Sequence, residues 1–300
     1  LKYIHFYSPN NNIEQNRKIL CKKLVGTNKS IYFCTNKTTR FRQKMRVTIL
    51  QKDIYWADIE ANLIIANRMI KESKGSDLYL LPEMWSTGFA TEPEGIAEGV
   101  TPEENRTLNW MINAAKDNLC VIAGSVAVKD GEKYKNRFYF IRPDGSYEYY
   151  DKHHLFRFGN EDKYYEAGNK RIIVEYKNIR FLLSTCYDLR FPIWQRNFND
   201  YDVMLMTANW PGARQNAWDT LLKARAIENQ CYVLGCNRVG DDPYSHYVGG
   251  SAIIDAYGHT LYQSMKEEND IITTELDMEA LRHFRAKFSV LEDVDKITFE

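Results

Sequence analysis

The chain places a carboxylate, an ammonium and a thiol directly after apolar, strand-like segments: Glu83, Lys152 and Cys186. In α/β proteins, ligands bind at the carboxyl ends of the strands, because loops and helix N-termini converge there. A thiol nucleophile, a base and a cation are the groups that nucleophilic acyl transfer requires. We expect Lys152 to lower the pKa of the Cys186 thiol from its usual ~8.5, and Glu83 to accept the proton.

Each of the three residues also has an ordinary interpretation. Glu83 suits the start of a helix and Lys152 a solvated surface, because most Glu and Lys are exposed. Cys186 suits an inert core position, because free Cys is among the most buried residue types. Histidine is the usual base for a cysteine, but the adjacent His153 and His154 would point apart in an extended segment, which favours surface or packing roles. Spacing alone leaves open whether the three groups converge.

The elements that must position these groups follow from the hydrophobic pattern. Short apolar or alternating runs predict strands over 45–50, 78–81, 121–128, 134–141, 147–150, 181–183, 203–206, 231–236, 250–256 and 271–276. Helical spacing predicts helices over 56–74, from 101 onward, over 218–229 and over 278–287. Thr101, followed by Pro102 and Glu104, has the composition of a helix start, and Asp277 that of a cap.

Residues 45–300 are therefore predicted to form one domain. The segment shows no short repeat and no low-complexity linker, and it mixes hairpins with strand–helix units. Hairpin turns are expected at Asp130-Gly131 and at Pro143-Asp-Gly145. A regular barrel should lack so many hairpins, so the pattern predicts a layered α/β sandwich.

The charge distribution separates the first 44 residues from the rest. They carry ten Lys or Arg and one acid, whereas residues 45–300 carry 30 basic and 39 acidic residues. An acidic body offers no electrostatic footprint for nucleic acid. Residues 1–44 begin without Met, are rich in Lys and Asn and lack a sustained period. We interpret them as a disordered or non-native leader before a start at Met45, rather than as a functional basic arm; their serine content is low for a transit peptide.

The six cysteines are too few for a disulfide scaffold in 300 residues, and we expect reduced thiols in a cytoplasmic protein. Cys231 and Cys236 have four residues between them and no nearby histidine, so we expect no zinc site. No apolar run approaches the ~18 residues of a membrane span. A hydrophobic fraction of 44% is enough for a substantial core.

From about Met45 to its end, the sequence resembles the nitrilase (carbon–nitrogen hydrolase) superfamily, most closely its omega-amidase branch of bacterial 2-oxoglutaramate-type amidases. The matching motifs occur in the order expected of that family. They are Leu81-Pro-Glu-Met-Trp-Ser-Thr-Gly-Phe89, Tyr150-Asp-Lys-His-His-Leu-Phe156, Cys186-Tyr-Asp-Leu-Arg-Phe-Pro192, Asn209-Trp-Pro211, Ala224-Arg-Ala-Ile-Glu-Asn-Gln-Cys231, Asn237-Arg-Val-Gly240 and Gly249-Gly-Ser251.

The resemblance implies a four-layer αββα sandwich, a homodimer and a Glu-Lys-Cys triad that needs no cofactor or metal. Glu83 would be the base, Cys186 the nucleophile that forms a thioester, and Lys152 the oxyanion stabiliser together with the backbone N–H of Tyr187. It further identifies Glu161 as a second, supporting glutamate. The N-terminal extension is the one departure from the family pattern.

An omega-amidase substrate is a small 2-oxo acid with a carboxylate at the end opposite its amide. A planar guanidinium suits that carboxylate, and Arg190 is the nearest candidate; an ion pair with Asp188 is its alternative role. Trp210 and Phe156 are candidate pocket walls, with ordinary core packing as the alternative for each.

Three other functions compete with this interpretation. The nearest is another member of the superfamily, a carbamoylase or a nitrilase. The second is a non-catalytic binding or scaffold protein on the same fold, against which the intact triad argues. The third is a papain-like cysteine protease, for which His246 is the downstream histidine in a loop-like setting.

Overall fold

The computed structural model describes residues 20–23, 32–35, 44–295 and 297, in a chain that divides into two units, Leu1–Arg42 and Gln43–Glu300. In the first unit, β1 (Leu20–Lys23) pairs antiparallel with β2 (Tyr32–Thr35). The leader predicted over residues 1–44 falls mostly outside the described residues and stays a prediction.

Two six-stranded mixed sheets form the centre of the second unit. The order in one sheet is β16 (Asp270–Asp277), β3 (Lys44–Gln51), β4 (Leu78–Leu80), β5 (Val121–Asp130), β6 (Lys133–Ile141) and β7 (Tyr147–Asp151). The order in the other is β15 (Thr260–Gln263), β14 (Ala252–Ile254), β11 (Tyr232–Cys236), β10 (Val203–Thr207), β9 (Ile179–Thr185) and β8 (Ile173–Tyr176). The predicted strands are confirmed, with ends that shift by a few residues.

Strand direction decides where the functional side chains lie. β3, β4 and β5 run parallel, and so do β9, β10 and β11, whereas the outer strands of both sheets pair antiparallel. β7 is two antiparallel steps from β5, so it points the same way as β4. The carboxyl ends of β4 and β7 therefore share one edge of their sheet, and those of β9 and β10 share one edge of the other.

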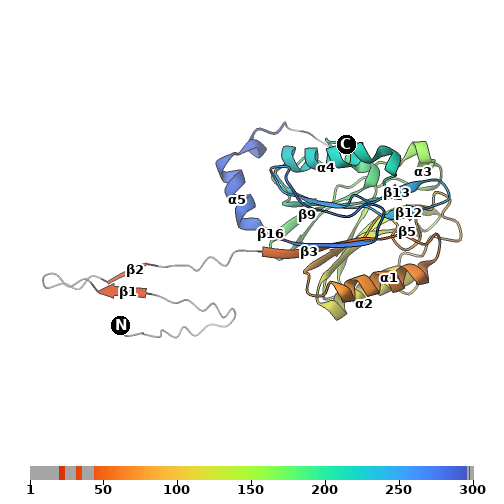
Figure 1. The fold of residues 1–300 in the computed structure, drawn as a ribbon, viewed down its shortest axis with the longest axis horizontal. Coiled ribbons are helices and arrows are strands. Elements are labelled where there is room, and N and C mark those ends of the chain that lie inside the picture. Colours follow the sequence, from red (N-terminus) through yellow and green to blue (C-terminus); the bar gives the residue numbers. More distant parts are fainter. Residues whose placement is uncertain (1–19, 24–31, 36–43, 296, 298–300) are drawn as a thin grey trace. The chain divides into compact units, whose positions relative to one another are not determined.

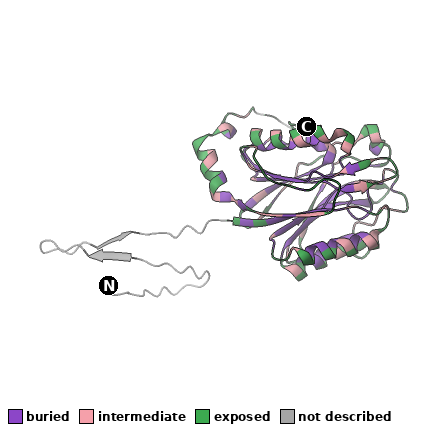
Figure 2. Cartoon of the chain, viewed as in Figure 1, coloured by how far each residue is buried: buried purple, intermediate pink, exposed green. Residues whose placement is uncertain are grey.

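The hydrophobic core has three layers, which make the unit an αββα sandwich. Inward residues of both sheets pack between them, as alternation along β9 illustrates: Phe181 and Leu183 face this central layer, and Leu182 faces the other way. The outer layers lie under α1 (Ile59–Glu72) and α2 (Arg106–Asn118) on one side, and under α4 (Gln215–Glu228) on the other (Figure 1). Burial follows these layers (Figure 2), and the predicted fold class is confirmed.

One helix start differs from the prediction. α2 begins at Arg106, and its cap is Asn105, whose side chain accepts a hydrogen bond from the Leu108 N–H at 2.7 Å. Thr101 lies in a turn and donates to Glu104 instead. Two cap-like segments stand in tandem here, and the buried Asn105 is the one at which the amphipathic period begins.

The other helix ends agree with the sequence. Asp58 caps α1, and Asp277 caps α5 (Met278–Lys287) by accepting from two backbone N–H groups. The remaining short elements are α3 (Glu161–Tyr164), the strands β12 (Val239–Asp241) and β13 (His246–Val248), and the 3-10 turns η1 (Arg157–Gly159), η2 (Cys186–Arg190), η3 (Gly212–Arg214) and η4 (Val290–Glu292). None of the helices in the described ranges combines the length and apolar character that a bilayer crossing requires.

Candidate active site

Three strand ends deliver the predicted groups. Glu83 lies three residues beyond β4, Lys152 directly follows β7, and Cys186 directly follows β9 as the first residue of η2. Cys186 has a φ of +46°, in the left-handed region that side chains with a Cβ rarely adopt. Such strain is often found at functional positions, and here it turns the chain sharply at the thiol.

The structure brings both glutamates onto one ammonium. Lys152 Nζ lies 2.9 Å from Glu83 Oε1, 2.8 Å from Glu161 Oε2 and 3.1 Å from Glu161 Oε1. All three side chains are wholly excluded from solvent. The supporting Glu161, expected from the family resemblance alone, thus contacts the same nitrogen as Glu83. α3 begins at this residue, and the backbone N–H of Phe156 donates to its Oε2 at 2.6 Å.

The two glutamates hold the buried lysine in its charged form. Burial opposes the positive charge of Lys152, but Glu161 and Glu83 outweigh burial and keep the pKa of this lysine well above its usual value. Burial raises the pKa of Glu161, and Lys152 counteracts that rise. The lysine is therefore a permanent cation at neutral pH, and it cannot act as a proton donor or acceptor there.

Lys152 lowers the pKa of the Cys186 thiol, as expected, but other effects outweigh it in the resting site. Burial, followed by the negative charge of Glu83, raises the pKa of the Cys186 thiol well above its usual range, and the opposing effect of Lys152 is smaller. The sequence shows the cation but not the depth of burial. A resting thiol needs a base at the moment of attack, and Glu83 is the carboxylate whose charge acts most strongly on it.

Asn209 connects the carboxylate and the thiol, a role that the sequence analysis did not assign. Its backbone N–H donates to Glu83 Oε2 at 2.8 Å, and its side-chain amide donates to the Glu83 carbonyl oxygen at 2.7 Å. The Sγ of Cys186 lies 3.9 Å from the Asn209 carbonyl oxygen. Asn209 follows β10, the neighbour of β9, so sheet register places it beside Cys186.

A second polar cluster fixes the segments on either side. Asp188 caps η2 by accepting from the backbone N–H of Thr185 at 2.9 Å, and it also accepts from the Tyr150 hydroxyl at 2.7 Å. The backbone N–H and the ring Nδ1 of His154 contact its other oxygen. Cys186 and Lys152 each lie two residues from a member of this cluster, so the cluster sets their separation.

The adjacent histidines have packing roles, as expected, but the prediction that they point apart is wrong. Their ring centroids are 4.5 Å apart, because the chain bends beyond the end of β7. His153 stacks on Trp194 and His154 on Phe191, each at 3.7 Å between centroids. Stacking on these aromatic rings, and the contact of His154 with Asp188, explain the positions of both imidazole rings.

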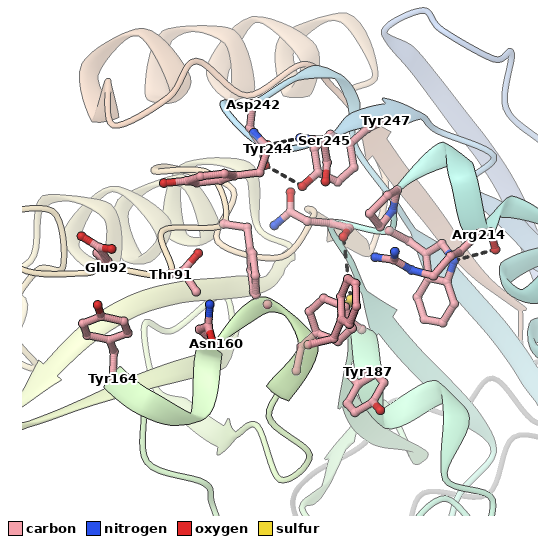
Figure 3. A pocket seen from close by; sticks show the side chains of 18 of the residues that line it. Thr91, Glu92, Asn160, Tyr164, Tyr187, Arg214, Asp242, Tyr244, Ser245 and Tyr247 are labelled. Carbon is pink, nitrogen blue, oxygen red and sulfur yellow. Dashed lines mark hydrogen bonds between the residues drawn. The ribbon is translucent and has the colours of Figure 1, made fainter.

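A cavity of about 380 Å³ opens above Cys186. Cys186 is the one of the four predicted catalytic residues that lines it, and the other three lie buried behind. Figure 3 shows Glu92 and Tyr164 on one side of the cavity and Arg214 on the opposite side. All four predicted substrate-binding residues line this cavity: Tyr187, Arg190, Trp210 and Phe156.

Two guanidinium groups face the cavity from its aromatic walls. Arg190 lies over the Trp210 ring at 4.9 Å, and Arg214 lies over the Phe156 ring at 5.2 Å. Among the described residues, neither guanidinium makes an ion pair, so the expected alternative pairing of Arg190 with Asp188 is absent there. Arg214 stands three residues after the Asn209-Trp-Pro211 motif, but the sequence analysis missed it because its contact with Phe156 joins segments that are far apart in sequence.

Two other features would indicate different chemistry at the cavity: a histidine partner for Cys186 and a cluster of metal-binding side chains. His246 is more than half exposed and pairs with Asp241, and no histidine is among the described residues that line the cavity. Within the described ranges, no three His, Cys, Asp or Glu side chains come together in a way that could hold a metal ion.

The chain resembles known proteins along nearly all of its second unit. The model of the family described as carbon-nitrogen hydrolase matches residues 46–286. The chain is 44% identical over 253 residues to the omega-amidase YafV of Escherichia coli K12, covering 84% of this chain and 97% of that protein. It is 34% identical over 258 residues to the 2-oxoglutaramate amidase of Bacillus subtilis 168, covering 84% and 98%.

A solved structure agrees with these sequence matches. XC1258 from Xanthomonas campestris, described as a CN-hydrolase superfamily protein with an arsenic adduct in the active site, superposes with a TM-score of 0.82 and 38% identity. The alignment covers 86% of this chain and 99% of that chain. Sequence and fold similarity therefore extend over the elements that carry the site.

Proposed function

The chain belongs to the carbon–nitrogen hydrolase family, and on that premise we propose that it is an omega-amidase, which releases ammonia from the terminal amide of a small 2-oxo acid of the 2-oxoglutaramate or 2-oxosuccinamate type. The observation that carries the proposal is a buried Glu-Lys-Glu cluster behind a cavity whose floor exposes a cysteine. The 44% identity to an omega-amidase supports the substrate class.

The proposed reaction begins with proton transfer. Glu83 takes the proton from Cys186 as the sulfur attacks the amide carbonyl carbon, and the carbonyl oxygen becomes an oxyanion. Lys152 and the backbone N–H of Tyr187 stabilise that oxyanion; loss of one such donor typically costs about 2.7–4 kcal/mol of barrier. The ammonium of Lys152 has three hydrogens. One is donated to Glu83, and the two oxygens of Glu161 can share a second, so the third is left for the oxyanion.

The second half of the reaction uses the same carboxylate. Glu83 returns its proton to the amide nitrogen, the carbon–nitrogen bond breaks and ammonia leaves, so that the substrate remains as a thioester on Cys186. Glu83 then takes a proton from water, the resulting hydroxide adds to the thioester, and the sulfur leaves as a thiol with that proton. Glu161 keeps Lys152 charged and in place throughout.

The far end of the substrate is proposed to meet the two guanidinium groups. Arg190 is the nearer in sequence to the nucleophile, and Arg214 lies on the wall that Phe156 forms. A guanidinium binds a carboxylate through paired hydrogen bonds, and neither side chain is engaged by an acid among the described residues. Trp210 and Phe156 hold the guanidinium planes and confine the carbon chain between them.

A substrate panel tests this function against its neighbours. Ammonia release is measured for 2-oxoglutaramate, an N-carbamoyl amino acid and an aliphatic nitrile, with the wild-type protein and with Cys186→Ala. We expect release from the omega-amide with the wild type alone. Preference for the carbamoyl compound or the nitrile would replace the proposal with the carbamoylase or nitrilase alternative. Undiminished release by Cys186→Ala would exclude the thioester route, and no release from any compound would favour a non-catalytic binding protein.

We also propose a homodimer in a reducing compartment, the cytoplasm. Cys120, Cys186, Cys231 and Cys236 are free and buried thiols, which suits that compartment. Ile227, Tyr257 and Phe288 are more than half exposed, and ring contacts through Phe284 join the last two into one apolar surface. Exposed apolar surface of this kind favours association. Light scattering after size exclusion tests it: a dimer mass is expected for the wild type and a monomer for Phe288→Glu.

A further inference from the structure

Asn136 on β6 occupies the centre of the buried cluster, and nothing in the motifs assigned it a role. Its side-chain nitrogen donates to Glu83 Oε1 at 2.7 Å and to Glu161 Oε1 at 3.2 Å, so each amide hydrogen serves one carboxylate. Its backbone oxygen accepts from the Lys152 N–H at 2.9 Å. Asn136 thereby contacts all three charged residues of the cluster.

The side-chain oxygen of Asn136 shows that packing alone does not explain this residue. That oxygen is buried and has no hydrogen-bond partner among the described residues. A buried, unpartnered carbonyl is unfavourable, and an apolar residue of similar size would avoid it. Rotating the amide by half a turn would set this oxygen against the oxygens of two carboxyl groups, whereas the observed orientation gives each glutamate a hydrogen-bond donor.

The two carboxylate oxygens of Glu83 differ in the hydrogen bonds that they accept. Oε1 accepts from Lys152 and from Asn136, so both of its lone-pair directions are occupied. Within the described part of the chain, the one hydrogen bond to Oε2 comes from the backbone N–H of Asn209. The Cys186 thiol contacts the carbonyl of that same residue, so Oε2 is the oxygen on the thiol side with a free lone pair.

We propose that Asn136 is a positioning residue of this site: it donates one hydrogen to each glutamate, keeps both as acceptors on Lys152, and leaves Oε2 of Glu83 to receive the Cys186 proton. The inference rests on the proposed function only in that Cys186 is the nucleophile. The titratable groups that act on Glu83 are Lys152, Glu161, Cys186 and the buried hydroxyl of Tyr165, which donates to Ala90 O at 2.7 Å.

The test follows the rate at which iodoacetamide alkylates Cys186, from about pH 5 to about pH 9, with peptide mass spectrometry to identify the modified cysteine. This readout needs no amide substrate. In Asn136→Leu, the carboxylates of Glu83 and Glu161 each lose a hydrogen-bond donor. A donor stabilises the charged form of a carboxyl group, so its loss raises the pKa. The acid limb of the profile is the pH range over which the alkylation rate falls as the pH is lowered, and we expect it to move up by about one to two pH units. The pH profile of kcat/KM for the omega-amide should shift by the same amount, with KM nearly unchanged.

Two further variants complete the test: a second substitution of Asn136 and a control at another buried asparagine. Asn136→Asp preserves the side-chain shape and removes the donors at neutral pH. It replaces Asn136→Leu if the leucine variant does not fold, and the acid limb of its alkylation profile should also move up. Asn105→Ala removes a buried asparagine that caps α2 and whose side chain bonds Gly99 and Leu108; it should lower the melting temperature and leave the limb in place. A limb that stays at the wild-type pH in the folded Asn136 variants, or that moves equally in Asn105→Ala, would overturn the inference. Failure of the wild type on omega-amides would defeat the proposed function instead, and the alkylation profile would still decide the role of Asn136.

Discussion

The hydroxyl of Tyr150 donates to Oδ2 of Asp188 at 2.7 Å, and this bond joins the two sheets of the sandwich at the site. Tyr150 belongs to β7, which leads into Lys152, and Asp188 lies in η2, which begins with Cys186. Both side chains are buried. A hydrogen bond between neighbours of the reacting groups therefore helps to fix the separation between the lysine and the thiol.

Replacing Tyr150 by Phe should remove this bond and keep the ring. Asp188 would lose a donor in a buried setting, which typically destabilises a protein by about 1–3 kcal/mol. We expect a fall of that size in the free energy of unfolding in urea, and a fall in kcat that exceeds any rise in KM. Tyr79→Phe is the matched control, because the buried hydroxyl of Tyr79 donates to the Ser73 carbonyl away from the site; it should lose stability and keep kcat. Equal kcat values in the two variants would contradict the positioning role.

Replacing Lys152 by Met should leave two buried glutamates without a cation. Removing one partner of a buried ion pair typically costs about 3–5 kcal/mol, whereas Lys135→Met, which breaks a pair with the exposed Glu166, should cost at most about 1 kcal/mol. Urea unfolding measures both. Adding Glu161→Gln to Lys152→Met should restore part of the stability and none of the activity. A Lys152→Met protein as stable as Lys135→Met would show that the cluster is not held by charge.

Stability should fall at alkaline pH because of buried thiols. Burial, with a smaller contribution from Asp77, raises the pKa of Cys120 to about 12, whereas in the unfolded chain a thiol titrates near ~8.5. Between these values the unfolded state releases the proton and the folded state keeps it, so rising pH favours unfolding by about 1.4 kcal/mol per pH unit for this thiol. The full stability is present below ~8.5.

The measurement is the free energy of unfolding of wild type and Cys120→Ala from about pH 9 to about pH 11. The wild-type curve should be steeper by about 1.4 kcal/mol per pH unit, on top of any loss that both proteins share from other buried groups. Parallel curves would show that Cys120 titrates alike in the folded and unfolded states.

Removing a guanidinium from the cavity should weaken binding of an anionic substrate. A hydrogen bond to a charged group contributes about 1.5–3 kcal/mol, so Arg190→Met should raise KM for 2-oxoglutaramate by roughly 10- to 100-fold with a smaller change in kcat. Arg214→Met should act in the same direction. For an uncharged amide of similar length, neither change should raise KM appreciably. Arg68→Met, on the exposed face of α1, is the control, and a KM that rises equally for charged and uncharged amides would contradict carboxylate binding.

The sequence predicts the fold and the reacting groups because both depend on local patterns. Short apolar or alternating runs identify the strands, and parallel strands bring their carboxyl ends to one edge, so Glu83, Lys152 and Cys186 follow from where apolar runs stop. The helix start at Thr101 was wrong because two cap-like segments stand within five residues of each other. Local composition cannot decide between them, whereas packing of the amphipathic face selects Asn105.

The supporting residues could not be predicted in the same way. Asn136 lies on β6, and Asn209 and Arg214 lie in the segment that follows β10. Each acquires its role from a residue more than 50 positions away: Asn136 and Asn209 from Glu83, and Arg214 from Phe156. The net shift in the pKa of the Cys186 thiol could not be predicted either, because the sign of the lysine charge is visible in the sequence and the depth of burial is not.

The central claim is that Cys186 carries the substrate as a thioester, and a rapid acid quench tests it most directly. Wild-type protein is mixed with 2-oxoglutaramate, quenched during turnover and mapped by peptide mass spectrometry. The account predicts that the peptide containing Cys186 gains the mass of the substrate less ammonia, that hydroxylamine removes this mass, and that Cys186→Ala shows neither the adduct nor ammonia release. Ammonia released by Cys186→Ala at the wild-type rate, or an acyl adduct on another residue, would contradict it.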